Sequence, residues 1–98
     1  MEERTRAQDL RLAVILELEN LLKEQVESGH LQLQQGMSEQ LDKQFWNAST
    51  RSGEKADQAY QELVRLMQRC GAITEDKLAE LVNSVDAAMT REELLTRS

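Results

Sequence analysis

Proline is absent from this 98-residue sequence, and aromatic side chains are scarce. The only aromatic residues are Phe45, Trp46 and Tyr60, so a core has to be built from Leu, Val, Ile, Met and Ala. Glu, Gln, Leu, Lys, Arg and Ala, which have the highest helix propensities, are abundant instead. We therefore expect an all-α fold of the helical-bundle or coiled-coil kind.

Cysteine and long hydrophobic runs are also lacking. The single cysteine, Cys70, cannot form an internal disulfide, which favours a reducing compartment. The densest apolar run, Leu12–Leu18, is much too short to cross a bilayer. The first ten residues are charged where a signal peptide needs an apolar segment. These features predict an intracellular, cytoplasmic protein without a membrane contact.

Positive charge is in deficit, because 12 Lys and Arg residues stand against 18 Asp and Glu residues, for a net charge of −6. An acidic chain is not attracted to the phosphates of nucleic acids or to anionic lipids. We therefore expect neither nucleic acid nor a membrane as its partner.

Apolar residues recur at helical spacing through the first half of the chain, which predicts an N-terminal helical arm over residues 5–47, capped by Thr5. Serine and glycine residues weaken this pattern near residues 29–37, each by up to ~1 kcal/mol relative to alanine. Two alternatives stay open at this point. The arm is either one long helix, or two helices of which the second is capped by Ser38.

Small polar residues gather at residues 48–53 and predict a loop. Ser52 is placed to cap the next helix, and the periodic segments beyond it predict helices over residues 54–70 and 74–97. We expect these two helices to form a bent second arm that packs antiparallel on the first, as a long helical hairpin. Oligomerisation, most simply as a dimer, is expected to complete the bundle.

The corner between the last two helices is the most sharply defined part of the sequence. Gly71 is expected to end the preceding helix in a left-handed conformation, and Thr74 to cap the following one. Ile73 and Leu78 stand at the positions of a hydrophobic staple, in which two apolar side chains touch across the cap.

Residues 75–97 also match part of the spacing of a DNA-reading helix-turn-helix. Ala79, Asn83 and Met89 stand where a small residue, a turn and an apolar contact are needed. The segment holds six acidic and three basic residues, however, and Asp86 stands where the reading helix begins. Such charges oppose contact with phosphates. A helix-turn-helix transcriptional regulator is therefore the alternative interpretation, not the main one.

Three isolated patterns have structural explanations that we prefer. Glu27 and His30 have the spacing of metal ligands in helical bundles, but a two-metal site needs this motif twice. The glycosylation acceptor at Asn47–Ser49 indicates an exposed loop. Cys70 lies on an apolar seam, which favours a core residue over a nucleophile.

The first helix is the most informative feature, because it is apolar on more than one side and such a helix has to be covered on several sides. No catalytic constellation or cofactor motif is recognisable, so we predict neither enzyme activity nor a cofactor. We predict a protein–protein interaction protein, such as a helical adaptor, an assembly subunit or a small inhibitor, that binds a protein partner or itself. The candidate interaction residues are Leu12, Ile15, Leu16, Leu22 and Trp46.

Overall fold

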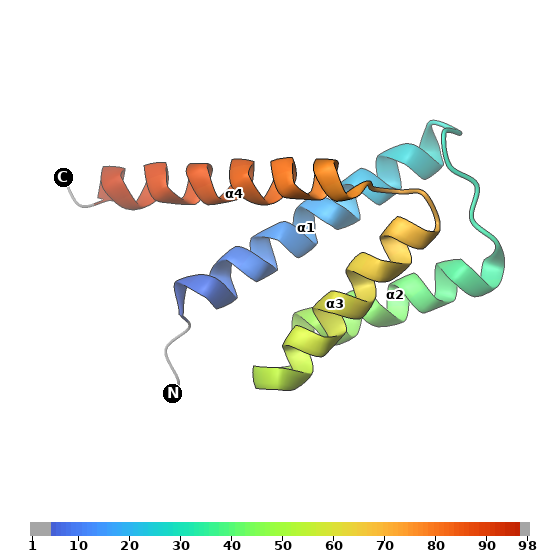
Figure 1. Ribbon diagram of the computed structural model, residues 1–98, viewed down its shortest axis with the longest axis horizontal. Coiled ribbons are helices and arrows are strands. Elements are labelled where there is room, and N and C mark those ends of the chain that lie inside the picture. The colour runs from blue at the N-terminus through green and yellow to red at the C-terminus, as the bar shows by residue number, and fades with distance from the viewer. Residues whose placement is uncertain (1–4, 97–98) are drawn as a thin grey trace.

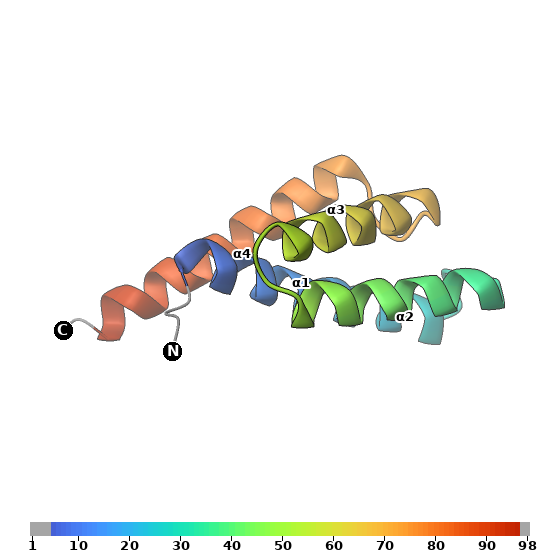
Figure 2. The same ribbon diagram turned by 90° about the horizontal axis from the view of Figure 1, so that it is seen from below.

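The computed structural model describes residues 5–96, which form four α-helices (Figure 1). The helices are α1 (Arg6–Glu27), α2 (Gln35–Thr50), α3 (Gly53–Arg69) and α4 (Glu75–Thr96). Because no strand occurs in this part of the chain, the all-α prediction is confirmed. α2 and α3 lie side by side as an antiparallel pair, while α1 packs against both α2 and α4 (Figure 2).

The core lies between the first three helices and is almost entirely aliphatic, as the scarcity of aromatic residues requires. In α1 the buried side chains recur every three or four residues and so share one face of the helix. α4 has no fully buried residue and attaches through a half-buried apolar stripe. The buried residues of α1 are Val14, Ile15, Leu18 and Leu22, and the stripe of α4 is Leu78, Leu81, Val82 and Val85.

The first arm is broken into two helices, which is the second of the two alternatives left open by the sequence. α1 ends at Glu27, and Gly29 has a φ of 81°, in the left-handed region where glycine stops helices. The prediction that Ser38 caps the second helix is wrong. Gln34 occupies the N-cap position of α2 without a side-chain hydrogen bond, and Ser38 lies inside the helix.

The predicted loop at residues 48–53 is shorter than expected, because α2 continues to Thr50 and only two residues join it to α3. The Thr50 hydroxyl donates to the carbonyl oxygen of Trp46 at 2.8 Å, within the helix. Ala48 is buried in the core, so this last turn of α2 is held by packing despite its polar composition. Ser52 occupies the N-cap position of α3 as predicted, but its side chain makes no cap hydrogen bond.

The corner between α3 and α4 has the predicted geometry. Gly71 has a φ of 83°, and the Thr74 hydroxyl accepts a hydrogen bond from the backbone N–H of Lys77 at 3.2 Å. Ile73 is buried, and Leu78 packs half-buried against the same core, in the positions expected of a staple. The glycine stop and the threonine cap therefore set the direction in which α4 leaves the core.

α4 is a single uninterrupted helix. The helix-turn-helix alternative required a turn at Asn83, and the helix continues through this residue, so the two-helix unit is not formed between residues 75 and 96. Neither glycine nor proline occurs in the segment, and nothing in it breaks the helix. Residue 97 of the predicted unit lies outside the described residues.

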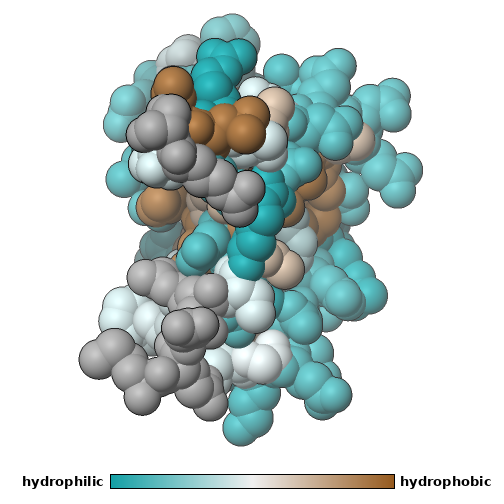
Figure 3. Space-filling model, turned by 90° about the vertical axis from the view of Figure 1, so that its left-hand side faces the viewer, coloured by the Kyte–Doolittle hydropathy of each residue, from teal (hydrophilic) through white to brown (hydrophobic). Residues whose placement is uncertain are grey.

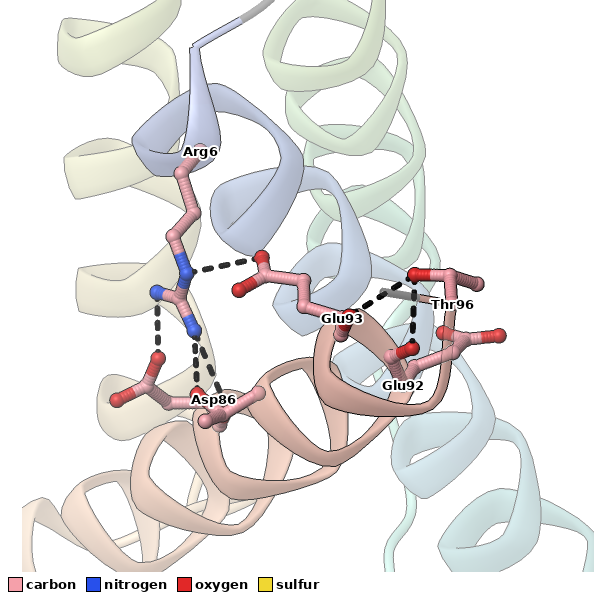
Figure 4. Close-up of polar contacts among 6 residues, drawn as sticks. Arg6, Asp86, Glu92, Glu93 and Thr96 are labelled. Atoms are coloured by element: carbon pink, nitrogen blue, oxygen red, sulfur yellow. Dashed lines mark hydrogen bonds and ion pairs between the residues drawn. The ribbon is translucent and has the colours of Figure 1, made fainter. Parts of the chain in front are cut away.

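Polar contacts join α1 both to the corner before α4 and to the second half of α4. Near the start of α4, the Gln25 side-chain amide donates to the carbonyl oxygen of Ala72 at 2.8 Å. Farther along, the Arg6 guanidinium approaches Asp86 at 2.6 Å and Glu93 at 3.1 Å (Figure 4).

Arg6 also donates to the Thr90 hydroxyl at 2.8 Å. Its three partners, Asp86, Thr90 and Glu93, are four and three residues apart and so lie on one face of α4. The hydrogen bond that Arg6 donates to Asp86, together with the attraction of both carboxylates, raises the pKa of Arg6 above its ordinary value, against a smaller opposing effect of burial. Arg6 therefore joins the first turn of α1 to the last three turns of α4.

We expect Gly71→Ala to lower the free energy of unfolding by about 1 kcal/mol or more, because alanine resists positive φ. Thr74→Ala should cost about 0.5–2 kcal/mol by removing the cap. Gly36→Ala is the matched control. Gly36 lies inside α2, with open space where a Cβ would stand, so the change should be neutral or stabilising by up to ~1 kcal/mol. Urea denaturation measures all three, and stabilisation by Gly71→Ala would contradict the left-handed corner.

Arg6→Ala should accelerate amide hydrogen exchange in residues 86–96, because this half of α4 loses its polar contacts with α1, while α2 and α3 keep their protection. Arg65→Ala is the control, since the ion pair of Arg65 with Glu62 at 2.9 Å lies within α3. Exchange in α4 that is equal for wild type and Arg6→Ala would show that the apolar stripe alone holds the helix.

Candidate functional site

A groove runs between α1 and α2, formed by two adjoining cavities of about 680 and 330 Å³. The cavities share Leu22 and Lys23 of α1 and Asp42 of α2. Along α2 the groove is lined from Ser38 to Thr50, a distance of about 18 Å at 1.5 Å per residue. We call this feature the α1–α2 groove.

The floor of the groove is apolar and two of its exposed lining residues are apolar as well. Leu22 and Phe45 are each 8% exposed and connect the groove to the core. Val26 is 43% exposed and Trp46 is 70% exposed. Phe45 and Trp46 point about 100° apart around α2, so when Phe45 enters the core its neighbour is directed out of it. An exposed tryptophan over an apolar floor is characteristic of a contact surface.

The rim of the groove has an excess of negative charge. Glu19, Lys23, Glu27 and Asp42 line it, and Lys23 lies 3.6 Å from Glu19 in an ion pair one helical turn apart. Within residues 5–96, no ion pair or side-chain hydrogen bond involves Glu27 or Asp42. Each of the two helices that border the groove therefore carries one carboxylate without an ion-pair partner among these residues, Glu27 on α1 and Asp42 on α2.

The structure divides the predicted interaction residues of α1 into two sets. Ile15 and Leu22 are buried at 1% and 8% exposure, and are covered within the single chain. Leu12 is half-buried and Leu16 is 62% exposed. The sequence suggested that a hairpin would cover α1 on one side only. The break after Glu27 instead gives α1 two neighbouring helices, α2 and α4, and these cover most of its apolar surface.

Leu12 and Leu16 are adjacent to the groove along α1. Residues 12, 16, 19 and 23 are separated by four, three and four positions, so they follow one stripe of the helix. Glu19 and Lys23 on this stripe line the groove. Of the five predicted residues, Leu12, Leu16 and Trp46 therefore remain accessible near one continuous surface, and Leu22 forms part of its floor.

A second exposed apolar surface lies at the end of α4, which sequence reasoning did not single out. Leu94 and Leu95 are 63% and 68% exposed. Figure 3, in which this end of the molecule faces the viewer, shows brown, apolar surface among teal, hydrophilic surface. The sequence could have indicated this surface, because Leu94 and Leu95 are adjacent and point about 100° apart around the helix. A single apolar stripe therefore cannot bury both of them.

The isolated patterns of the sequence are explained by local structure. His30 lies beyond the end of α1, with Nδ1 2.6 Å from the Ser28 hydroxyl, so it does not share a helix face with Glu27. Asn47 is half-buried within α2, and the expectation of an exposed loop there is wrong. Cys70 is half-buried against the core, and its thiol lies 3.4 Å from the carbonyl oxygen of Met67.

Burial raises the pKa of Tyr60, which packs against the core, although the nearby charge of Arg11 opposes this shift. Arg11 itself forms an ion pair with Asp57 that joins α1 to α3. In the described part of the chain, no group of three or more His, Cys, Asp or Glu side chains is arranged to hold a metal ion.

None of the four described helices combines the length and the apolar character that crossing a membrane requires. Comparisons with protein-family models, with curated protein sequences and with solved structures found no match for this chain.

Proposed function

We propose that this chain is a non-enzymatic protein–protein interaction protein, acting as a helical adaptor, an assembly subunit or a small inhibitor through the α1–α2 groove. The observation that supports this proposal is the exposure of Trp46 beside the apolar floor formed by Leu22 and Phe45. Burying a large apolar side chain contributes about 1.5–3 kcal/mol, and tryptophan is enriched among residues that dominate binding energies. A partner that covers Trp46 would gain this contribution.

The proposal includes self-association through the exposed stripe of α1. Leu16 and the half-buried Leu12 continue the lining of the groove and provide apolar surface that a second copy could cover. Ile15 and Leu22 are excluded from this contact because the chain itself covers them. Since each copy has a net charge of −6, association should be stronger at moderate salt than at low salt.

Self-association can be tested by sedimentation velocity over a range of micromolar concentrations at two ionic strengths. We expect wild type to form a dimer or larger species, and Leu16→Glu to shift the population to monomer with unchanged helix content. Ile15→Glu should instead unfold the chain, because it places a charge in the core.

Leu94→Glu is the matched control, because Leu94 is exposed to the same extent as Leu16, at 63% against 62%, but lies on α4. Loss of association with Leu94→Glu and not with Leu16→Glu would move the contact to the end of α4. A monomer at every concentration would contradict the self-association part of the proposal.

A further inference from the structure

We infer that the occupant of the α1–α2 groove is an amphipathic helix with basic flanks, supplied by a different protein. This inference rests on the proposed function, since it names the kind of partner that binds the same groove. It follows from the shape of the groove, from the charge of its rim and from the charge of the chain as a whole.

The shape of the groove fits a helix. Its length of about 18 Å along α2 corresponds to roughly 12 residues, or three turns, of a bound helix. Leu22 and Phe45 form an apolar floor along this length, and Val26 and Trp46 add exposed apolar surface. A helix that binds in this way places apolar residues three or four positions apart into the groove and leaves its other faces in water.

The negative charge of the rim favours a bound helix with positively charged residues beside its apolar stripe. Glu27 of α1 and Asp42 of α2 stand on opposite sides of the groove with no ion-pair partner among residues 5–96. Lysine or arginine residues on both sides of the apolar stripe of a bound helix would meet these carboxylates. Such exposed pairs add little affinity each, but they favour a basic partner over an acidic one and accelerate association.

The same charges disfavour a second copy of this chain as the occupant of the groove. Its exposed leucines at the end of α4 lie within residues 91–97, where two acidic and two basic residues leave no excess of positive charge to meet the rim. A second copy has a net charge of −6, so Glu27 and Asp42 would on the whole repel it. Electrostatic complementarity therefore indicates a different, basic chain.

The binding test uses three synthetic helical peptides of roughly 12 residues, each labelled for fluorescence anisotropy. The first has an apolar stripe flanked by lysines, and the second has the same stripe flanked by glutamates. The third contains the same residues as the first in a scrambled order, so its apolar residues no longer share one face of the helix. Emission of Trp46, the only tryptophan in the sequence, reports independently whether the indole loses contact with water.

We expect the lysine-flanked peptide to bind more tightly than the other two by tenfold or more at low salt, with a shift of Trp46 emission to shorter wavelength. Trp46→Ala should weaken this binding by roughly tenfold. The double variant Glu27→Lys and Asp42→Lys should weaken it by a similar factor and strengthen binding of the glutamate-flanked peptide.

Glu17→Lys with Glu39→Lys is the matched control, because these exposed acids lie on the same two helices and do not line either cavity. The control makes the same change in net charge and should retain most of the binding. Equal weakening by both double variants, or equal binding of the first and third peptides, would reduce the effect to net charge and overturn the inference.

The remaining outcomes separate this inference from the proposed function. Tighter binding of the glutamate-flanked peptide would overturn the basic partner and leave a groove-binding protein. A shift of Trp46 emission that depends on protein concentration in the absence of any peptide would make a second copy the occupant of the groove. Absence of binding to any peptide, with a monomeric chain and no emission shift, would overturn both the inference and the proposed function.

Discussion

The apolar surface of α1 extends around more than one side of the helix, and the rest of the fold is arranged so that this surface leaves water. A single neighbouring helix cannot cover such a surface, because it contacts only one side of α1. The left-handed residue Gly29 ends α1 and lets the chain return as α2 along one side, and the corner at Gly71 directs α4 along another. Ile15 and Leu18 are consequently buried, although the described residues form only four helices.

The groove is a by-product of the same arrangement. α2 uses Leu41, Phe45 and Ala48 to pack into the core, and these three residues occupy one face of the helix. Trp46 therefore lies beside the contact with α1 and not inside it. Because Leu22 and Phe45 reach the base of the groove, a ligand there would touch the edge of the core. Binding of a helix there would therefore be coupled to folding through the same side chains, and it should stabilise the α1–α2 pair.

Features that depend on short-range chemistry could be predicted from the sequence, while those that depend on tertiary packing could not. The cap at Thr5, whose hydroxyl accepts from the backbone N–H of Gln8, and the corner at Gly71 and Thr74 are confirmed, because each is set by residues a few positions apart. The last turn of α2 was wrongly predicted as a loop, since only the packing of Ala48 against the core makes its polar residues helical.

The same distinction applies to the candidate site. Trp46 could be identified from its position one residue after an apolar stripe. The burial of Ile15 and Leu22 could not be anticipated, because it follows from the break after Glu27, which gives α1 the two neighbours α2 and α4. The return of α4 to α1 involves Arg6, which is more than 80 residues away from Thr90 and Glu93 along the chain. The groove as a whole also escaped prediction, since its lining comes from two helices whose separation at Gly29 the sequence left open.

Quenching of Trp46 fluorescence tests the central claim most directly, namely that the folded chain keeps an open, acidic-rimmed groove beside an exposed indole. In the folded state, confirmed by circular dichroism, acrylamide should quench Trp46 almost as efficiently as it quenches the unfolded chain. At low salt, quenching by the cation caesium should be enhanced over its value for free tryptophan, and quenching by the anion iodide reduced, because Glu27 and Asp42 attract cations to the groove. An indole protected from acrylamide, or one whose quenching by iodide is enhanced relative to free tryptophan, would contradict the account.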